Sequence, residues 1–467
     1  MSKDRRHFLD TFFYPESVAV VGASRNVGTV NYNLVYNLVK FKFPGKVYPV
    51  NPNSEEILGL KAYPSLQSIE GPVDLAVVSV PAAKTPDIVR DCVAKGVKAV
   101  TLTAGGFSEV GSKGRSVQDE MRKLLRENGI RATGPNALSP INSRNNLIIS
   151  FGPVDKLPQG DLSFIFQSGL YEPRFNWLLS GFHLYLSKLL DLGNKMDVNE
   201  VDALEYLSQD PETKVIAMHL ESVAGDGRRF MQILKETTRT KPVLVLKSGR
   251  TSAGAKAASS HTGAIIKSSD AVFDVVLRQS GAIRVEGLDE FFDLAKIFEY
   301  LPPLKNNRIA IATFPGGEAV ISADFCQLYG LTMAELSPET YRKLSAVFPP
   351  WEIPVNPFDM GVSSQFHFGV DIYRSLLENL ADDPNVDCLA LHLAGYRSAV
   401  QGEFARPFVE AVKKGKAVVT WASDPRMTDM IEQLESNRIP VYPSAERAIK
   451  ALAALHRYHK IREARRE

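Results

Sequence analysis

Residues 17–24, SVAVVGAS, carry the pattern that decides the fold, because a mostly apolar run leads directly into a turn of Gly, Ala and Ser. Residues 161–169, DLSFIFQSG, and residues 308–317, RIAIATFPGG, repeat this pattern. Continuous apolar runs of this kind are typical of strands in parallel sheets that are covered on both faces. Segments that can be helical follow, for example at residues 32–41 and 319–328. The alternation predicts an α/β protein with three consecutive open parallel sheets.

The predicted units are separated by segments that lack any strand or helix period. Residues 134–160 and 302–307 are of this kind and are rich in Pro and Asn. A chain of 467 residues accommodates roughly three domains of about 150 residues each. We therefore predict domains at residues 1–140, 150–301 and 303–467.

Composition excludes several classes of protein. The formal net charge of +2 gives no reason to expect a nucleic-acid partner. The cysteines Cys92, Cys326 and Cys388 are far apart, so they form neither a metal-binding spacing nor a disulfide framework, and we expect a cytoplasmic protein. The N-terminus does not resemble a signal peptide, and no apolar run approaches the roughly 18 residues that cross a membrane. We expect no membrane partner.

The turn after the first predicted strand is a candidate nucleotide site. Ligands of open α/β sheets bind beyond the carboxyl ends of the strands, where glycine lets the backbone approach a phosphate. The second strand ends at Asn51, without the acidic residue that an NAD site has for the ribose, which disfavours an NAD-linked oxidoreductase. A tight turn without a ligand is the alternative for the glycine motif alone. The candidate residues, from four strand ends, are Gly22, Ala23, Ser24, Arg25, Asn51, Pro52, Val80, Pro81, Gly105, Gly106 and Phe107.

Residues 257–264, AASSHTGA, place one of eight histidines, His261, among small residues in what we expect to be a loop. Ser260, Thr262 and the amide of Gly263 can donate hydrogen bonds to a phosphoryl group. Imidazole is partly neutral near pH 7, so one ring nitrogen is a free nucleophile. The alternative is an ordinary surface or core histidine.

Two strand ends could assist this histidine. Gln167, Ser168 and Gly169 are expected to open a helix whose N–H groups bind phosphate. Glu221, at the end of another strand, can accept the second ring N–H and so orient the imidazole. For Glu221 the alternative is a surface carboxylate. We interpret the nearby His219 as structural.

Longer stretches carry a resemblance to a known family. They are FFYPESVAVVGAS, GKVYPVNP, TAGGFSEVG, GPNALSPIN, QSG, LGNKMDVNEVDALEYLSQDPETKVI and SSHTGA, in order along nearly the whole chain. The chain resembles the nucleoside-diphosphate-forming acyl-CoA synthetases, relatives of succinyl-CoA synthetase, and matches the α-subunit of the ADP-forming acetate–CoA ligases. The resemblance implies a Rossmann-like CoA-binding domain and two flavodoxin-like domains.

The resemblance also implies a reaction and roles for the candidate residues. Phosphate would attack acyl-CoA, His261 would take the phosphoryl group from the acyl phosphate and release the carboxylic acid, and ADP would then become ATP. Glu221 would hold the phosphohistidine, and Asn136 would contact the acyl substrate. The family commonly has other residues at Ala137, at 170–174 and at Phe314, which leaves the acyl specificity open.

The chain has no Walker A motif. The resemblance therefore implies a separate ATP-grasp β-subunit that binds ADP or ATP with Mg²⁺, in a hetero-oligomer such as α2β2, and we expect no metal site on this chain. A CoA- or acyl-CoA-binding sensor that has lost catalysis is the alternative function, because of the departures from the family pattern.

Overall fold

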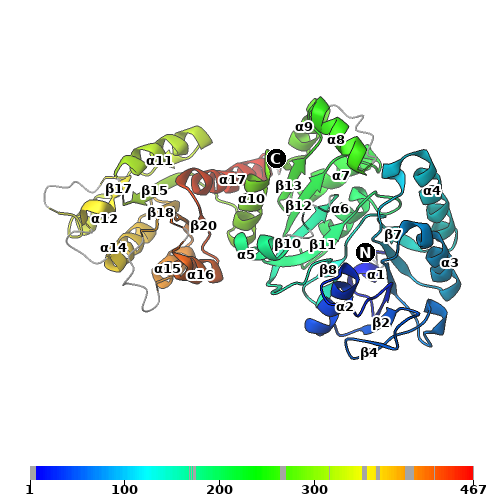
Figure 1. Cartoon of the computed structure of the whole chain (residues 1–467). Helices are drawn as coiled ribbons and strands as arrows, with labels where there is room; N and C mark the ends of the chain where they lie inside the picture. The colour runs from blue at the N-terminus through cyan, green and yellow to red at the C-terminus, as the bar shows by residue number, and fades with distance from the viewer. Residues whose placement is uncertain are drawn as a thin grey trace. The chain divides into compact units, whose positions relative to one another are not determined.

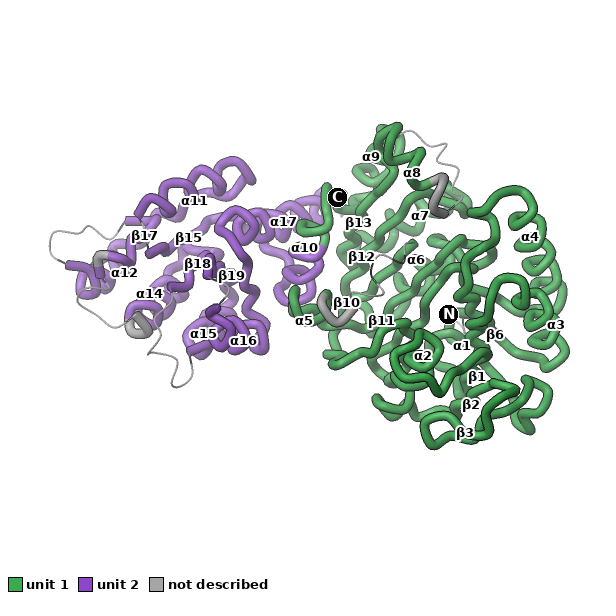
Figure 2. The backbone as a smooth tube through the Cα atoms, viewed as in Figure 1, with its two compact units in different colours: residues 1–291 green, residues 292–467 purple. Residues whose placement is uncertain are grey.

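The chain forms two compact units, residues 1–291 and residues 292–467 (Figure 2). The division falls inside one helix, α10 (Leu288–Tyr300). The three predicted domain boundaries stay predictions, because the compact units do not test them. The computed structural model describes residues 7–167, 169, 171, 175–262, 270–314, 316–349, 355–363, 369–394, 404–424 and 426–465.

The first sheet of unit 1 has five parallel strands in the order β2-β1-β5-β6-β7. Val18 and Val20 of β1 share a hydrophobic cluster with helix α2, whereas Ala19 and Val21 share one with α3 and α4. Figure 1 shows α3 and α4 side by side. The elements are α1 (Asp10–Phe13), β1 (Ser17–Val21), α2 (Val30–Lys40), β2 (Lys46–Val50), β3 (Glu56–Ile57), β4 (Leu60–Lys61), β5 (Leu75–Val78), α3 (Thr85–Lys95), β6 (Ala99–Leu102), α4 (Ser112–Glu127) and β7 (Arg131–Thr133).

The second sheet of unit 1 has the order β14-β13-β12-β10-β11-β8-β9. Its strands are parallel except β8 and β9, which run antiparallel at one edge. The elements are β8 (Ile141–Asn142), β9 (Leu147–Ile148), β10 (Gln159–Phe166), α5 (Phe175–Gly181), β11 (Leu186–Asp191), α6 (Glu200–Gln209), β12 (Val215–Leu220), α7 (Gly227–Thr237), β13 (Val243–Lys247), α8 (Ser252–Thr262), α9 (Asp270–Ser280) and β14 (Ile283–Val285).

Unit 2 contains a third parallel sheet, in the order β16-β15-β18-β19-β20, with β17 also paired to β15. The elements are β15 (Arg308–Thr313), α11 (Gly316–Tyr329), β16 (Thr332–Met333), α12 (Pro338–Leu344), β17 (Phe358–Asp359), α13 (Met360–Ser363), α14 (Gly369–Asp382), β18 (Cys388–His392), α15 (Arg406–Lys413), β19 (Ala417–Trp421), α16 (Thr428–Ser436), β20 (Val441–Tyr442) and α17 (Ala445–Glu463). Three mostly parallel sheets confirm the predicted fold class.

Two local predictions are wrong. Residues 252–262 were expected in a loop but form helix α8, because alanine has the highest helix propensity and the Thr251 hydroxyl accepts a hydrogen bond from the Gly254 amide at 3.1 Å. Residues 134–160 were expected to be a connection without regular structure. They instead contain β8, β9 and the start of β10, because Ile141 and Leu147 are buried edge-strand residues of the second sheet.

The two sheets of unit 1 are joined through the buried carboxylate of Asp191, the last residue of β11. One oxygen accepts a hydrogen bond from the Leu138 amide at 2.9 Å, and the other accepts one from the Gly193 amide at 3.1 Å. The Ser139 hydroxyl donates to the Asp191 carbonyl at 3.0 Å. Burial raises the pKa of Asp191 to about 7, against the opposing effect of the two backbone N–H groups.

We expect Asp191→Asn to flatten part of the pH dependence of stability. The pKa of Asp191 is raised from 3.8 to about 7, so between these values the folded state holds more protons than the unfolded state. The stabilising contribution of protonated Asp191 to the free energy of unfolding is therefore fully present below about pH 4. It is lost as the pH rises through 7, a change of up to about 4 kcal/mol. Urea titrations at acid and neutral pH should show a smaller loss of unfolding free energy in the variant. An equal loss in both proteins would contradict this assignment.

Candidate functional site

The second sheet of unit 1 changes winding direction at β10, which lies between β11 and β12. Such a switch point, at the carboxyl ends of the strands, is where open α/β sheets bind ligands. Gln167 follows β10 and Glu221 follows β12, and both are buried. The Gln167 side-chain oxygen accepts hydrogen bonds from the amides of Glu221 at 2.9 Å and Ser222 at 3.3 Å. The structure thus brings together two residues that the sequence predicted to assist the same histidine, His261.

Two lysines, which sequence reasoning missed, lie beside this carboxylate. The Lys195 ammonium pairs with the buried Glu200 carboxylate at 2.8 Å and donates to the Ser222 carbonyl at 2.7 Å. Burial lowers the pKa of Lys195, and the charges of Glu200 and Glu221 oppose that shift. Lys195 belongs to the LGNKMDVNEVD stretch, so its position in the family motif was an available signal.

Lys247 is the last residue of β13 and is 3% exposed. Burial lowers the pKa of Lys247, and the negative charges of Asp270 and Glu221 oppose the effect. The sequence offered a signal for this lysine, because it directly follows the apolar run of residues 242–246. It lies where β13 ends and the chain continues to α8.

A chain of hydrogen bonds crosses the same edge of the sheet. The Tyr171 hydroxyl lies 2.8 Å from Nδ1 of His219, and Nε2 of His219 lies 3.0 Å from the Ser248 hydroxyl. Burial and the charge of Lys247 lower the pKa of His219 to about 4, so its imidazole is neutral at pH 7. These contacts fit the structural interpretation of His219.

Tyr171 also changes the path of the chain after β10. Its ring stacks on Phe166, with 3.8 Å between the ring centroids. Gly169 and Tyr171 are therefore not helical, and the prediction that Gln167 directly opens a helix is wrong for these residues. Ser168, Leu170 and residues 172–174 lie outside the described residues.

The predicted phosphohistidine lies at the C-terminal end of α8, which spans Ser252–Thr262. The structure describes the backbone of Ser260, His261 and Thr262 within this helix but not their side chains, and Gly263 lies outside the described residues. Their roles remain predictions. Over residues 252–258 of the helix, Ala258 is the one buried residue.

The first sheet has its own switch point between β1 and β5. Gly22 has a φ of +89°, and a Cβ there would lie 2.2 Å from the Ser79 carbonyl oxygen, so the position requires glycine. The Asn31 amide donates to the carbonyls of Gly22 at 2.5 Å and Ser79 at 2.8 Å. Asn31, a further residue that sequence reasoning missed, therefore ties the two strand ends together.

The other predicted residues of the first sheet lie in the loops that follow its strands. The Asn51 amide donates to the Ala23 carbonyl at 2.7 Å, and the Ser24 hydroxyl accepts from the Asn26 amide at 3.0 Å. Arg25, Pro52, Pro81, Gly105 and Gly106 are exposed, Val80 is half-buried and Phe107 is buried.

The predicted acyl-contact residue Asn136 is exposed and has a φ of +60°. Its amide donates to the Ala104 carbonyl at 3.0 Å, which ties it to the loop after β6. In that loop, Glu109 accepts hydrogen bonds at 2.6 Å from the Gly106 amide and from the side chain of Asn194. Residues of the first sheet and of the LGNKMDVNEVD stretch therefore meet at Asn136.

Unit 2 has a polar cluster at its own switch point, between β15 and β18. Glu318 accepts a hydrogen bond from the Trp421 indole at 2.8 Å and lies 3.3 Å from Nδ1 of His392. Phe314, one of the departures from the family pattern, packs against the rings of Tyr373 and His392.

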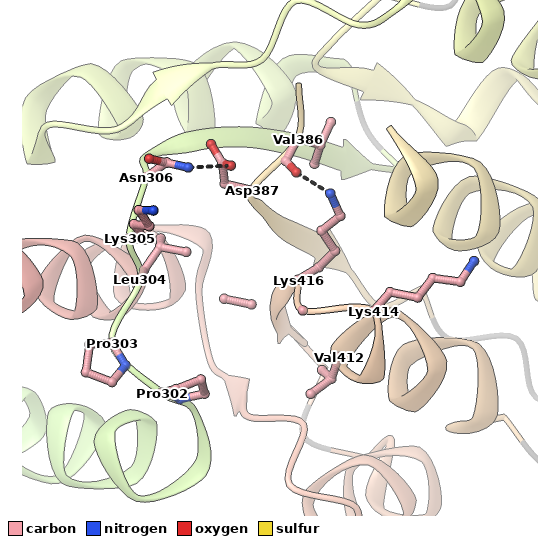
Figure 3. Close-up of a pocket in the computed structure, with 12 residues that line it drawn as sticks. Pro302, Pro303, Leu304, Lys305, Asn306, Val386, Asp387, Val412, Lys414 and Lys416 are labelled. Atoms are coloured by element: carbon pink, nitrogen blue, oxygen red, sulfur yellow. Dashed lines mark hydrogen bonds between the residues drawn. The ribbon is translucent and has the colours of Figure 1, made fainter. Parts of the chain in front are cut away.

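A cavity of about 260 Å³ in unit 2 lies at the opposite end of the strands (Figure 3). Its lining includes Leu304, Asn306, Asp387 and Lys416, at the starts of β15, β18 and β19. The Lys416 ammonium donates to the Val386 carbonyl and the Asn306 amide donates to Asp387 (Figure 3). Ligands of open α/β sheets bind at the other edge, so this cavity is not the candidate site.

Comparison with protein families matches two segments of the chain. Residues 16–141 match a CoA binding domain, and residues 159–298 match the flavodoxin-like domain of succinyl-CoA ligase. The first contains the Gly22 turn, and the second contains Gln167, Glu221 and His261. In the described part of the chain, no helix is long and apolar enough to cross a membrane.

Relatives cover nearly the whole chain. The α-subunit of ADP-forming acetate–CoA ligase II from Pyrococcus furiosus is 35% identical over 453 residues, 96% of this chain and 97% of the relative. ADP-forming acetate–CoA ligase II from Archaeoglobus fulgidus is 36% identical over 97% of this chain, which spans 67% of that longer protein. The solved acetyl-coenzyme A synthetase 1 of Ca. Korarchaeum cryptofilum, in complex with phosphate and ADP, has a TM-score of 0.86 at 32% identity over 97% of both chains.

The first sheet thus lies in the segment that matches a CoA binding domain, and most of the second lies in the segment that matches the flavodoxin-like domain of succinyl-CoA ligase. The chain belongs to the family of ADP-forming acetate–CoA ligases, which are acid–thiol ligases, and corresponds to their α-subunit.

Proposed function

We propose that the chain interconverts acyl-CoA, ADP and phosphate with a carboxylic acid, CoA and ATP, through an acyl phosphate and a phosphohistidine at His261. The observation that carries the proposal is the meeting of Gln167 and Glu221 at the switch point of the second sheet, within the same compact unit as the CoA binding domain. The relatives favour this function over a CoA-binding sensor, because their names describe ligases.

The chemistry proceeds in three transfers. A phosphate oxygen attacks the thioester carbonyl, the carbon–sulfur bond breaks, and CoA leaves as the thiol with an acyl phosphate formed. A nitrogen of His261 then attacks phosphorus and releases the carboxylate. Finally, the phosphoryl group passes to ADP. The covalent intermediate keeps the free energy of the thioester in a phosphoryl donor.

Glu221 orients the imidazole by accepting its second ring N–H, which leaves the other nitrogen free to attack. The candidate phosphate contacts are Gln167, Ser168, Gly169, Ser260, Thr262 and Gly263. CoA binds in the crevice of the first sheet, and the acyl group lies at Asn136, where the two halves of unit 1 meet.

The nucleotide binds on a partner. We propose an ATP-grasp β-subunit, with Mg²⁺ held beside ADP on that subunit, in a cytoplasmic hetero-oligomer such as α2β2. Two features support a partner. The Pyrococcus furiosus relative is named as an α-subunit, and this chain spans only 67% of the Archaeoglobus fulgidus relative, which has further residues outside the match.

Helix α8 is suited to deliver the phosphoryl group. Over residues 252–258 it is mostly exposed and Ala258 is the one buried residue, so this stretch has little apolar burial to lose when the helix moves. An isolated helix of 11 residues is also marginal in water. The segment can therefore leave its place at low free-energy cost and move toward the partner.

We expect the wild-type chain to bind CoA and not NAD in calorimetry, and Gly22→Ala to weaken CoA binding at least tenfold. The added Cβ would meet the Ser79 carbonyl oxygen at 2.2 Å and must disturb the crevice. Gly59→Ala is the control, because Gly59 also has a positive φ of +78° but no atom within 4 Å of a new Cβ. NAD binding tighter than CoA binding would refute the assignment.

We expect His261→Ala to abolish transfer of label from γ-³²P-ATP to the chain, measured with the β-subunit present, while circular dichroism and CoA binding are unchanged. His261→Asp should not restore activity, because a carboxylate repels the incoming phosphoryl anion. The label on the wild-type chain should survive alkali and be lost in acid, as a phosphoramidate is. His459→Ala, in helix α17, is the matched control. ATP formation by the alanine variant would overturn the proposal.

We expect Glu221→Gln to slow turnover roughly 10- to 100-fold, equivalent to about 1.5–3 kcal/mol for one charge-assisted hydrogen bond. The affinity for CoA should change little, because the CoA crevice lies in the other sheet. Rapid-quench measurement of phosphohistidine formation tests this directly. A variant with normal phosphorylation would show that Glu221 is only a strand end.

A further inference from the structure

One buried lysine of the described residues differs from the others in the partner of its ammonium group. Lys188, Lys195 and Lys296 each end on a carboxylate at 2.7–2.8 Å. Lys247 is also buried, at 3% exposed, yet its ammonium forms no ion pair with a carboxylate of the described residues. The hydrogen bond that its ammonium makes among these residues goes to the Ser248 carbonyl.

The acidic groups near Lys247 are engaged elsewhere. Both oxygens of Asp270 accept from the Arg284 guanidinium at 2.8 Å. Glu221 lies one residue beyond Leu220, the register partner of Lys247 on β12, and acts on the lysine electrostatically rather than as a direct ion pair. The ring of Phe273 lies 5.9 Å from the ammonium.

A buried ammonium without a carboxylate costs free energy, because its lost hydration is not replaced. Ionisable groups perturbed in this way cluster at functional sites, where a bound ligand can supply the missing charge. Lys247 ends β13 at the carboxyl edge of the sheet, next to Glu221 on one side and to the segment that enters α8 on the other. An anion bound between the Gln167–Glu221 pair and α8 would therefore meet this ammonium.

We propose that Lys247 is a ligand of the phosphoryl group at this site, whether that group is inorganic phosphate or is carried on His261. This inference rests on the proposed function. Lys195 does not share the role, because its ammonium is already held by Glu200 at 2.8 Å and by the Ser222 carbonyl. Glu221 acts on Lys247 only at longer range, so the ammonium is available to offset the charge of the phosphate.

Binding of inorganic phosphate to the His261→Ala chain, followed by calorimetry or ³¹P NMR line broadening, tests the proposal without any phosphohistidine. Adding Lys247→Met should weaken phosphate binding at least tenfold, whereas Lys247→Arg should stay within about fivefold. Lys241→Met is the matched control. Lys241 precedes the same strand at its other end, where it donates to the carbonyls of Leu207 and Asp210.

The same variants separate a binding role from a structural one. Lys247→Met should leave the thermal midpoint unchanged or raise it, because methionine removes an unpaired buried charge. Lys195→Met should lower the midpoint by several degrees, because it leaves the Glu200 carboxylate buried without its partner. A drop for Lys247→Met as large as that for Lys195→Met would overturn the proposal.

Two further outcomes would also overturn it: no phosphate binding by the His261→Ala chain at tens of millimolar, or unchanged binding after Lys247→Met. The test is distinguishable from that of the proposed function. If phosphate binds through Lys247 but the wild-type chain never takes label from ATP, the phosphohistidine proposal fails and this one stands. If label is incorporated at the normal rate in Lys247→Met and phosphate binding is unchanged, only this one fails.

Discussion

A parallel sheet must be covered on both faces, and this constraint decides where the chemistry of the chain can lie. Because helices cover both faces of such a sheet, most side chains along β1, β10 and β12 are apolar and buried. The polar groups of the two candidate sites lie mainly where the strands end. Parallel strands have their carboxyl ends at the same edge of the sheet. The Glu221 amide and the Gln167 side-chain oxygen, 54 residues apart in the chain, therefore come within hydrogen-bonding distance. The Gly22 turn and Ser79 meet in the same way in the first sheet.

The charges at the second sheet show how a buried site accommodates several ions. Lys195 and Glu200 form a close pair that holds the loop after Glu221, because Glu200 also accepts hydrogen bonds from the amides of Ala224 and Gly225. Lys247 and Glu221 interact at longer range. His219 adds no charge, since burial and Lys247 keep its imidazole neutral. Among the described residues, Lys195 is thus held in an ion pair, whereas the Lys247 ammonium donates a hydrogen bond to the Ser248 carbonyl and forms no ion pair.

Rigidity is distributed unevenly within unit 1. The loop of residues 134–139 is held by Asp191 through the Leu138 amide and by the close approach of Gly193, where a Cβ would lie 2.3 Å from the Pro135 carbonyl oxygen. Helix α8, in contrast, buries a single residue over 252–258. In the proposed reaction, this combination would let the acyl group be held still while the carrier moves.

The sequence by itself determined the sheet architecture and the strand-end positions, because a buried parallel strand needs a continuous apolar run and the polar residue that follows it must lie at the edge. Gln167, Glu221 and the Gly22 turn could be predicted in this way. It could not predict that residues 252–262 form a helix, because their small residues suit a loop as well as a helix when no packing decides. The partners Lys247, Lys195, Asn31 and Asp191 were also decided only by the tertiary structure. Each of them acts on residues far away in the chain. A lysine or aspartate at a strand end can meet solvent, an ion pair or a buried site without an ion pair. Which of these it meets depends on the strands and helices that the fold brings beside it.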